Sequence, residues 1–244
     1  MRPAEMTDVL AVPAGLIDRP TPLSNSAVWE RRQAEFRAAA LQKPFQMALK
    51  RAMDIAVSAS ALLVLAPFFM LIALAIKIEN PGPVFFTQLR WGRGGKKIKV
   101  FKFRSMRTDL CDYSGVAQTT ANDPRVTRIG AFLRKTNIDE LPQLINILTG
   151  DMSLVGPRCH VPGMLAAGQL YEELVETYHL RHLVRPGLTG LAQANGFRGP
   201  TDREDLARGR INHDLEYIRT FSILLDIKIL VNTFVREIRG GTGF

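Results

Sequence analysis

The sequence predicts an α/β protein that is mostly helical, with a re-entrant membrane helix followed by a small cytosolic domain that carries amphipathic interfacial helices. Three observations predict this class. Residues 55–76 form a run of 22 residues without a charge. Residues 98–104 alternate apolar and basic side chains, as a half-exposed strand does, and several later segments have the apolar spacing of helices. We therefore expect an N-terminal arm at 1–45, a membrane helix-break-helix at 46–80 and the cytosolic domain at 81–244.

The net charge predicts an anionic partner. The chain has 244 residues, is 46% hydrophobic and carries a formal charge of +9, so it can bury one sizeable core and bind nucleic acid, a phosphate-bearing substrate or an acidic membrane surface. Residues 77–109 alone hold nine Lys or Arg and two acids. Few aromatic residues that are expected to be exposed interleave this stretch, and a membrane segment precedes it, so we expect no nucleic-acid partner.

The N-terminal region is predicted to be a poorly ordered arm. Residues 1–26 are rich in Pro, Ser and Thr without periodicity, and 29–41 have the character of a short helix. No apolar core of a signal peptide occurs in 1–47, so we expect a cytoplasmic N-terminus. Cys111 and Cys159 have no CxxC or Cys/His spacing, which indicates neither a disulfide framework nor a zinc site.

The apolar run at 55–76 predicts a membrane segment. As a helix, 22 residues would reach about 33 Å, enough to cross a hydrocarbon core of about 30 Å. Two features argue against a simple span: Pro67 removes a backbone hydrogen bond within the run, and basic residues flank both ends. We therefore predict a helix that breaks near Pro67 and leaves the membrane by the face it entered.

The remaining elements follow from local patterns. We expect a strand or hairpin at 98–104, helices at 129–133 and 141–148 with a stop at Gly150, and a further helix at 165–183. Residues 223–238 place Leu224, Ile227, Leu230, Val231, Phe234 and Ile238 on one helical face. This face could lie on a membrane surface or pack on the core. Residues 151–158 and 185–190 are predicted to be turns.

Asp139 and Glu140 are adjacent carboxylates with two competing explanations. Asn137 followed three residues later by Glu140 matches a capping box, in which acids near the helix start each gain about 0.3–1 kcal/mol. The alternative is chemical: one carboxylate attacks phosphorus while the other holds a divalent cation. The spacing alone allows both.

The basic and histidine residues also have two explanations. Lysines and arginines on a strand usually mark its solvated face, but Lys102 and Arg104 are two residues apart and so project to one side, as a phosphate-binding pair would. His179 and His182 are three apart on an expected helix without an evident third ligand. We therefore expect surface or core roles for these histidines.

Seven motifs, in order, resemble the bacterial sugar transferases, the monotopic polyprenyl-phosphate hexose-1-phosphate transferases that begin exopolysaccharide and glycan assembly. The motifs are Lys50-Arg51-Ala52-Met53-Asp54, Val100-Phe101-Lys102-Phe103-Arg104-Ser105-Met106, Asp123-Pro124-Arg125-Val126-Thr127, Leu133-Arg134 with Asp139-Glu140-Leu141-Pro142-Gln143-Leu144, Gly150-Asp151-Met152-Ser153-Leu154-Val155-Gly156-Pro157-Arg158, Arg185-Pro186-Gly187-Leu188-Thr189-Gly190 and Asp214-Leu215-Glu216-Tyr217. The chain is most similar to the short exopolysaccharide-type members, which lack a four-helix membrane region and an extra domain.

The resemblance implies a re-entrant helix, a cytosolic catalytic domain on the membrane and a magnesium-dependent dyad. In this chain Asp139 would be the nucleophile and Glu140 the Mg²⁺ ligand. The basic residues that match family positions would bind phosphate; they are Lys102, Arg104, Arg134, Arg158 and Arg185.

The chain departs from the family pattern at three places. Ala66-Pro67 stands where Ser-Pro is usual, Cys159 stands where the motif Gly-Pro-Arg-Pro ends in proline, and Leu191 stands where tryptophan is usual. These departures make the sugar weakly determined from the sequence.

The resemblance implies transfer of hexose-1-phosphate from a UDP-sugar, with galactose or glucose expected, to undecaprenyl phosphate. UMP would be released through an aspartyl-phosphosugar intermediate at the cytoplasmic face of the bacterial inner membrane. The competing hypothesis is a membrane-tethered protein that binds anionic lipid or a partner in a polysaccharide assembly complex. The sequence leaves open whether the chain forms a homo-oligomer.

Overall fold

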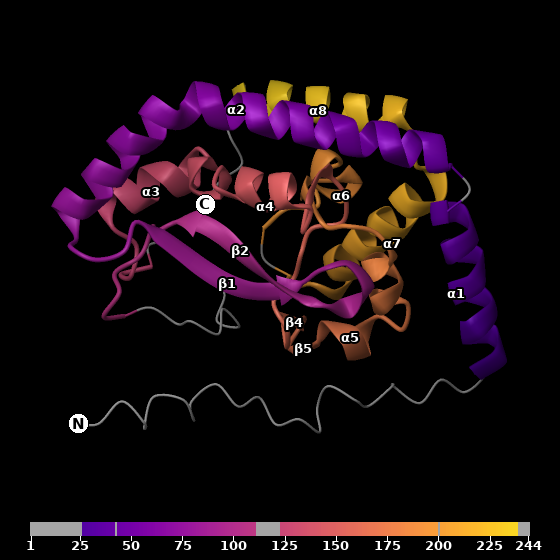
Figure 1. The fold of residues 1–244 in the computed structure, drawn as a ribbon. Coiled ribbons are helices and arrows are strands. Elements are labelled where there is room, and N and C mark those ends of the chain that lie inside the picture. Colours follow the sequence, from indigo (N-terminus) through magenta and orange to yellow (C-terminus); the bar gives the residue numbers. More distant parts are fainter. Residues whose placement is uncertain (1–25, 42, 111–122, 200, 239–244) are drawn as a thin grey trace, which may run out of the picture.

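The computed structural model describes residues 26–41, 43–110, 123–199 and 201–238. Two helices, α2 (Pro44–Glu79) and α8 (Ile223–Ile238), run side by side along one side of the molecule, and the rest of the described chain packs beneath them (Figure 1). Residues 1–25 of the expected N-terminal arm and Cys111 lie outside the described residues. The expected short helix at 29–41 is confirmed as α1 (Ser26–Leu41).

Helix α2 contains the predicted membrane segment. It starts with Pro44, whose missing N–H is not needed in a first helical turn, and is one continuous helix of 36 residues with Pro67 inside it. The helix bends along its course, as Figure 1 shows, and a proline is a standard cause of such a bend. The predicted break is therefore wrong. The backbone lacks one hydrogen bond at Pro67, but the helix continues through this residue.

The first half of α2 is fixed to the domain by buried polar side chains. Lys50 Nζ lies 2.6 Å from Asp226 Oδ2 of α8 and donates to the Val155 carbonyl at 2.9 Å. Asp54 Oδ1 accepts hydrogen bonds from Ser153 Oγ at 3.0 Å and Leu154 N at 2.9 Å. The inner face of this helix thus binds the domain, while its outer face stays apolar.

The predicted hairpin is confirmed. Strand β1 (Phe85–Trp91) pairs antiparallel with β2 (Lys97–Phe103) across the short η4 turn (Arg93–Gly95), and Phe86 lies opposite Lys102. The predicted helices after it are α3 (Arg128–Lys135) and α4 (Gln143–Thr149). Helix α4 ends at Gly150, whose φ of 95° is the left-handed conformation expected of a C-terminal glycine.

Two segments predicted to be turns contain strands instead. Strand β3 (Ser153–Val155) and strand β6 (Gly187–Thr189) form a parallel pair. A Cβ atom on Gly187 would lie 2.1 Å from the Gly156 nitrogen, so glycine is required there by close contact between two backbones. Gly156 and Gly187 thus indicate a close contact between two backbone segments rather than two isolated turns.

The single helix predicted at 165–183 is wrong. The segment holds the hairpin β4 (Leu165–Ala166) and β5 (Gln169–Leu170), then α5 (Tyr171–Leu174) and η6 (Tyr178–Leu183). Ala167 and Gly168 both have positive φ, 50° and 79°, which makes a two-residue hairpin turn of the primed kind. This turn outweighs the helical apolar spacing on either side of it.

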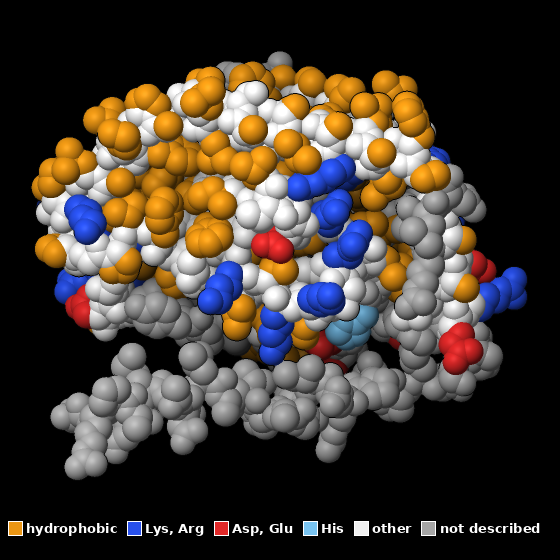
Figure 2. Space-filling view, viewed as in Figure 1, with side chains coloured by type: hydrophobic (Ala, Val, Ile, Leu, Met, Phe, Trp, Pro, Cys, Tyr) orange, Lys and Arg blue, Asp and Glu red, His pale blue; other side chains and the backbone are white. Residues whose placement is uncertain are grey.

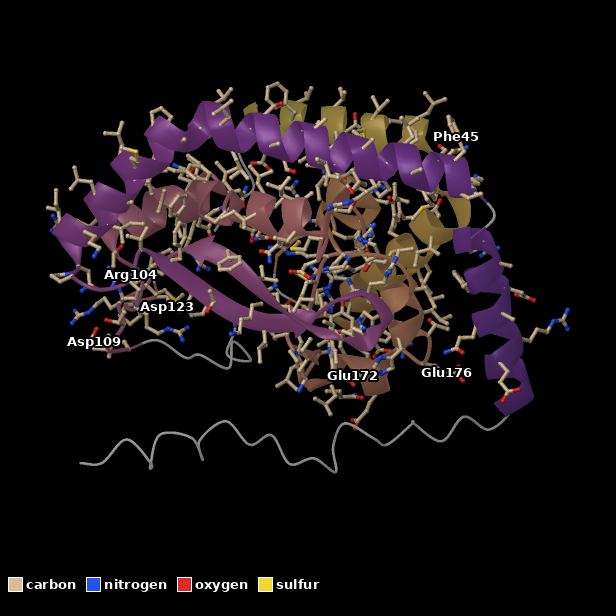
Figure 3. All side chains as sticks on the ribbon, in the orientation of Figure 1. Phe45, Arg104, Asp109, Asp123, Glu172 and Glu176 are labelled. Atoms are coloured by element: carbon tan, nitrogen blue, oxygen red, sulfur yellow. The ribbon has the colours of Figure 1, made fainter. Side chains whose placement is uncertain are left out.

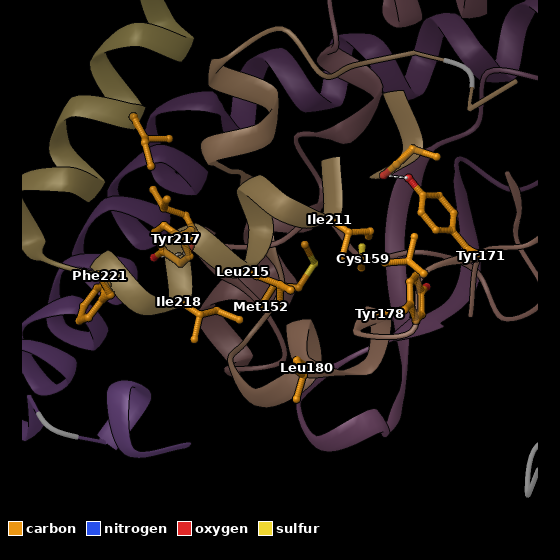
Figure 4. Close-up of a cluster of buried hydrophobic side chains, with 14 of the residues drawn as sticks. Met152, Cys159, Tyr171, Tyr178, Leu180, Ile211, Leu215, Tyr217, Ile218 and Phe221 are labelled. Carbon is orange, nitrogen blue, oxygen red and sulfur yellow. Dashed lines mark hydrogen bonds between the residues drawn. The ribbon is translucent and has the colours of Figure 1, made fainter. Parts of the chain in front are cut away.

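The core lies between α7 (Glu204–Thr220), β3 and the α5–η6 region, with α6 (Leu191–Ala194) beside it. Its large buried side chains include Met152, Tyr171, Tyr178, Ile211 and Ile218 (Figure 4).

Helix α8 confirms the helix predicted at 223–238. Leu224 and Phe234 on its predicted apolar face are 78% and 67% exposed, and Ile227 and Val231 are also exposed, so these four residues do not pack on the core.

Candidate active site

An exposed apolar surface covers one side of the molecule. Figure 2 shows apolar side chains along the outer faces of α2 and α8. In α2 they include Leu63, Val64, Met70, Leu71 and Leu74, each more than half exposed. Among the described residues, α2 is the one helix long and apolar enough to cross a membrane. An apolar surface of this extent indicates contact with lipid or another apolar partner.

A cavity of about 1110 Å³ lies between the hairpin, the η5 turn (Ile138–Glu140) and α8. Side chains of α2 and α8, including Val57, Leu230 and Phe234, form part of its wall. The cavity brings together six of the seven predicted site residues, which are Lys102, Arg104, Arg134, Asp139, Glu140 and Arg158. The cavity therefore joins a cationic wall to the two apolar helices.

Glu140 is held by two cations. Lys102 Nζ of β2 lies 2.7 Å from Glu140 Oε1, and Arg158 NH1 lies 3.0 Å from Oε2 while its NH2 donates to Oε1. Burial alone would raise the pKa of Glu140, but the charges and hydrogen bonds of Arg158 and Lys102 outweigh it and hold this pKa well below its usual range. The Glu140 carboxylate is therefore ionised and held in place by Lys102 and Arg158.

Asp139 is in the opposite situation. It is 5% exposed and lines the cavity, and its carboxylate accepts no hydrogen bond from the part of the chain that the structure describes. Burial raises the pKa of Asp139, with a smaller contribution from the charge of Glu140, while Lys102, Arg134 and Arg158 oppose the rise. The ionised form of this carboxylate is therefore poorly stabilised.

The capping-box explanation for this pair is wrong. Asn137 has a left-handed φ of 54° and makes no side-chain cap bond, and its Nδ2 instead donates to Glu237 Oε2 at 2.9 Å. The carboxylate of Glu140 points to Lys102 and Arg158 rather than back to the Asn137 N–H. The two acids thus face a cavity instead of stabilising a helix start.

The other predicted basic residues differ in their contacts. Arg134 lines the cavity, and no described residue bonds to its guanidinium, so it is available to a ligand. Arg104 also lines the cavity, but it donates to Asn80 Oδ1 at 3.0 Å and to the Asn80 carbonyl, at the end of α2 (Figure 3). Its contacts thus stabilise the helix end.

Arg185 does not line the cavity. Its Nε donates to the Gly150 carbonyl at 2.9 Å, and Arg51 donates to the carbonyls of Ile147 and Leu148. Both guanidinium groups therefore stabilise the C-terminal end of α4, which directly follows the acidic pair along the chain. The structure gives Arg185 this structural contact and does not place it beside Asp139 or Glu140.

Among the histidines, the structure singles out one that sequence reasoning missed. His160 lines the cavity two residues after Arg158, whereas His182 is buried outside it and His179 lies 3.5 Å from Glu172. Glu172 and Glu176 lie on the side of the domain opposite α2 (Figure 3). Within the described ranges no three His, Cys, Asp or Glu side chains form a metal-ligand group.

The fold and cavity define an enzyme for phosphate chemistry beside an apolar surface. Adjacent acids lie among basic side chains that can offset a substrate's negative charge, and α2 and α8 form part of the same wall. Comparison with known proteins then identifies the family: the chain belongs to the bacterial sugar transferases, whose model matches residues 45–240.

Curated relatives agree with this membership. The chain is 64% identical over 198 residues to the exopolysaccharide production protein PSS of Rhizobium leguminosarum bv. phaseoli, covering 81% of this chain and 99% of that protein. It is 53% identical over 185 residues to the UDP-glucose:undecaprenyl-phosphate glucose-1-phosphate transferase of Escherichia coli K12, covering 76% of this chain but 39% of that longer protein.

A more distant relative differs in its sugar. The UDP-N-acetylgalactosamine-undecaprenyl-phosphate N-acetylgalactosaminephosphotransferase of Aeromonas hydrophila is 40% identical over 204 residues, covering 83% of this chain and 46% of that protein. The predicted family is confirmed, and so is the prediction that the chain is a transferase enzyme.

Proposed function

We propose that the protein transfers hexose-1-phosphate from a UDP-hexose to undecaprenyl phosphate and thereby starts exopolysaccharide synthesis. The observation that carries this proposal is the contrast between the acids of the cavity: Glu140 is neutralised by Lys102 and Arg158, while buried Asp139 is unpaired among the described residues. A buried, unpaired carboxylate beside cations suits attack on phosphorus, because the cations screen the substrate's negative charge.

Glucose is the donor sugar that the relatives favour. Five of them, including those of Komagataeibacter xylinus, Escherichia coli and Xanthomonas campestris, are named as glucose or glucose-1-phosphate transferases at 47–53% identity. Galactose differs from glucose at one hydroxyl group and is the alternative. The departure at Leu191, in α6, lies in the motif that we expect to bear on this choice, and Cys159 lines the cavity.

The reaction has two half-reactions. An oxygen of Asp139 bonds to the phosphorus that bears the sugar, and the bond from this phosphorus to the bridging oxygen breaks, so UMP leaves with that oxygen. An oxygen of undecaprenyl phosphate then bonds to the same phosphorus, and the bond to Asp139 breaks, which regenerates the carboxylate. Arg134, which makes no bond to a described side chain, and Lys102 are placed to meet the phosphate charge.

The acids of the cavity are compatible with a magnesium ion. Mg²⁺ is commonly bound by one or two carboxylates together with substrate phosphates and water. Glu140 is ionised, and its Oε2 accepts one bond, from Arg158 NH1, so a lone pair remains for a metal. When bound with the diphosphate, Mg²⁺ would offset charge on the phosphate oxygens. We propose Glu140 as its protein ligand.

We further propose that α2 enters and leaves the membrane at its cytoplasmic face. The polar inner face of its first half is bonded to the domain through Lys50 and Asp54, and its last turn is held to Arg104. Both ends are therefore attached to the same domain, which suits a bent helix lying in one leaflet of the bacterial inner membrane. The exposed face of α8 would lie at the same surface.

The proposed function is tested with purified full-length protein, Mg²⁺, undecaprenyl phosphate and a panel of UDP-sugars. UMP release that requires UDP-glucose or UDP-galactose supports the proposal. Release with N-acetylated donors alone would replace the proposed sugar. Wild-type protein that releases no UMP with any donor would overturn the function itself.

A further inference from the structure

We propose that His160 forms a hydrogen bond to a hydroxyl group of the donor's hexose and is a sugar-reading residue of this active site. The proposal rests on the proposed function, since it assigns the sugar's place in the same cavity. It starts from a buried polar atom without a partner: His160 is 2% exposed and lines the cavity, yet its Nε2 bonds to no described group.

The ring of His160 is held in one orientation. Its Nδ1 lies 3.2 Å from the Tyr178 hydroxyl, and the ring packs against Tyr171 and Tyr178 with centroid distances of 4.8 and 5.7 Å. Because Nδ1 has a partner, Nε2 is the one ring nitrogen that remains without a bond to a described group. A buried polar atom left unpaired is energetically costly, so a ligand that bonds to it is favoured.

The chemistry of His160 favours a neutral ligand with hydroxyl groups. Burial, together with the nearby charges of Arg181, Arg210 and Arg90, holds the pKa of His160 well below its usual range, so the imidazole is neutral. A neutral imidazole offers either a donor or an acceptor at Nε2, depending on its tautomer. A hydroxyl group can match either one, whereas a phosphate oxygen can only accept.

The position of His160 favours the sugar over the nucleotide base. The Arg158 backbone bridges to Gly187, and the His160 carbonyl accepts a bond from Trp91 N. Arg158 and His160 are two positions apart, and a fully extended chain reaches about 3.3–3.6 Å per residue, so their Cα atoms lie no more than about 7 Å apart. Arg158 holds Glu140, the neighbour of the proposed nucleophile. The hexose is attached directly to the phosphorus that Asp139 attacks, whereas the base is separated from it by a second phosphate and a ribose.

The test compares His160→Gln and His160→Ala with a matched control, His182→Gln. His182 is also buried with an unpaired Nε2 and packs against Tyr178, but it does not line the cavity. For each protein, UMP release from UDP-glucose gives kcat/KM, inhibition by UDP gives the affinity for the nucleotide without sugar, and thermal unfolding reports the fold. Tyr178→Phe is included as a milder variant, because it removes only the hydroxyl that bonds to Nδ1 of His160 and orients its ring.

We expect His160→Ala to lower kcat/KM for UDP-glucose by about ten-fold, the loss of one well-placed hydrogen bond, and to leave inhibition by UDP unchanged. His160→Gln should lose less, and His182→Gln should keep wild-type kinetics. Unchanged kinetics in both folded His160 variants would overturn the proposal, as would equal weakening of UDP inhibition, which would assign His160 to the nucleotide. If wild-type protein were inactive with every donor, the proposed function would fail instead, and these two failures are distinct.

Discussion

Asp139 and Glu140 are neighbours in the chain, yet they have opposite environments. Glu140 accepts hydrogen bonds from Lys102 and Arg158, whereas Asp139, although buried in the same cavity wall, accepts none from the described residues. As a result the pKa of Glu140 is lowered and that of Asp139 is raised. Two carboxyl groups with separated pKa values are typical of groups with different catalytic tasks. The division of labour in the proposed reaction follows from this contrast.

Asp139→Asn should abolish activity without harming the fold. The variant keeps the shape of the side chain and removes the proposed nucleophile, so we expect UMP release to fall by at least about 10³-fold. The control is Asp151→Asn, an exposed aspartate that does not line the cavity and should keep its activity. Comparable activity in the two variants would remove Asp139 from the chemistry.

The stability of Asp139→Asn should equal or exceed that of the wild type at neutral pH. A carboxyl group whose pKa is raised by folding binds its proton more tightly in the folded state, so its ionisation as pH rises disfavours the folded state. Asparagine has no such ionisation. Thermal unfolding at pH 7 measures the difference, and a clear loss of stability in Asp139→Asn would show that the carboxylate has a structural role.

As the pH is lowered, kcat/KM should begin to fall at a higher pH than it would with an aspartate of ordinary pKa. The proposed nucleophile must be ionised, and burial raises the pKa of Asp139 above the usual value of about 3.9, so the acidic limb of the kcat/KM profile should lie above that value. The limb should rise with increasing pH. A profile that stays flat down to pH 4, with the protein still folded, would contradict the assignment.

Glu140→Gln should lower both stability and the response to magnesium. It leaves the charges of Lys102 and Arg158 without their partner, and because both side chains are partly exposed we expect a loss of about 1–3 kcal/mol at pH 7. Turnover should no longer increase on addition of Mg²⁺.

The stability difference for Glu140→Gln should also depend on pH. A carboxyl group whose folded pKa is depressed contributes stability above its unfolded pKa of about 4.3, and this contribution is lost as pH falls through the folded value. The wild-type advantage should therefore shrink in acid. If the wild type remained more stable than Glu140→Gln by the same amount below pH 3, the ion pairs of Glu140 would not be the source of the difference.

The buried pair between α2 and α8 should be sensitive to the loss of one partner. Lys50 and Asp226 are almost fully buried, and Tyr217 also donates to Asp226 Oδ1 at 2.8 Å. Asp226→Asn should therefore cost about 3–5 kcal/mol. Replacing both residues together, as Lys50→Met with Asp226→Leu, should cost less than Asp226→Asn alone. Urea unfolding of the wild type, Asp226→Asn and the double variant tests this, and a double variant that loses as much stability as Asp226→Asn, or more, would contradict it.

Both ends of α2 should be reachable from the cytoplasm and neither from the periplasm. In a chain without its native cysteines, Pro44→Cys and Pro81→Cys place labels at two exposed helix ends. A membrane-impermeant thiol reagent should label neither in intact cells and both in inverted vesicles. Labelling of one position from the periplasm would mean that the helix spans the membrane.

Much of the fold was predictable where one local pattern dominates. The apolar run of α2, the alternation of β2 and the glycine stop at Gly150 each have a single physical cause, and the structure confirms all three. The helix predicted at 165–183 failed because Ala167 and Gly168 adopt a turn that apolar spacing does not reveal. A break was predicted at Pro67 because proline removes one backbone hydrogen bond. The loss of one such bond does not interrupt α2, a helix of 36 residues.

The candidate site was predictable by residue type but not by contact. Six of the seven predicted residues line the cavity, yet the sequence gives no sign that Arg104 bonds to the end of α2 or that Arg185 bonds to the end of α4. Those contacts join residues distant in the chain. His160 was missed because its significance lies in an unpaired buried atom, and only a three-dimensional arrangement shows that.

The most direct test of the proposed chemistry uses donor without acceptor. Wild-type protein is mixed with Mg²⁺ and UDP-glucose labelled in the sugar, in the absence of undecaprenyl phosphate, and free UMP and protein-bound label are measured. We expect up to one equivalent of UMP and an equal amount of label on Asp139, released when undecaprenyl phosphate is added, and neither signal in Asp139→Asn. No UMP before the lipid is added, together with no labelled protein, would contradict a covalent intermediate on Asp139.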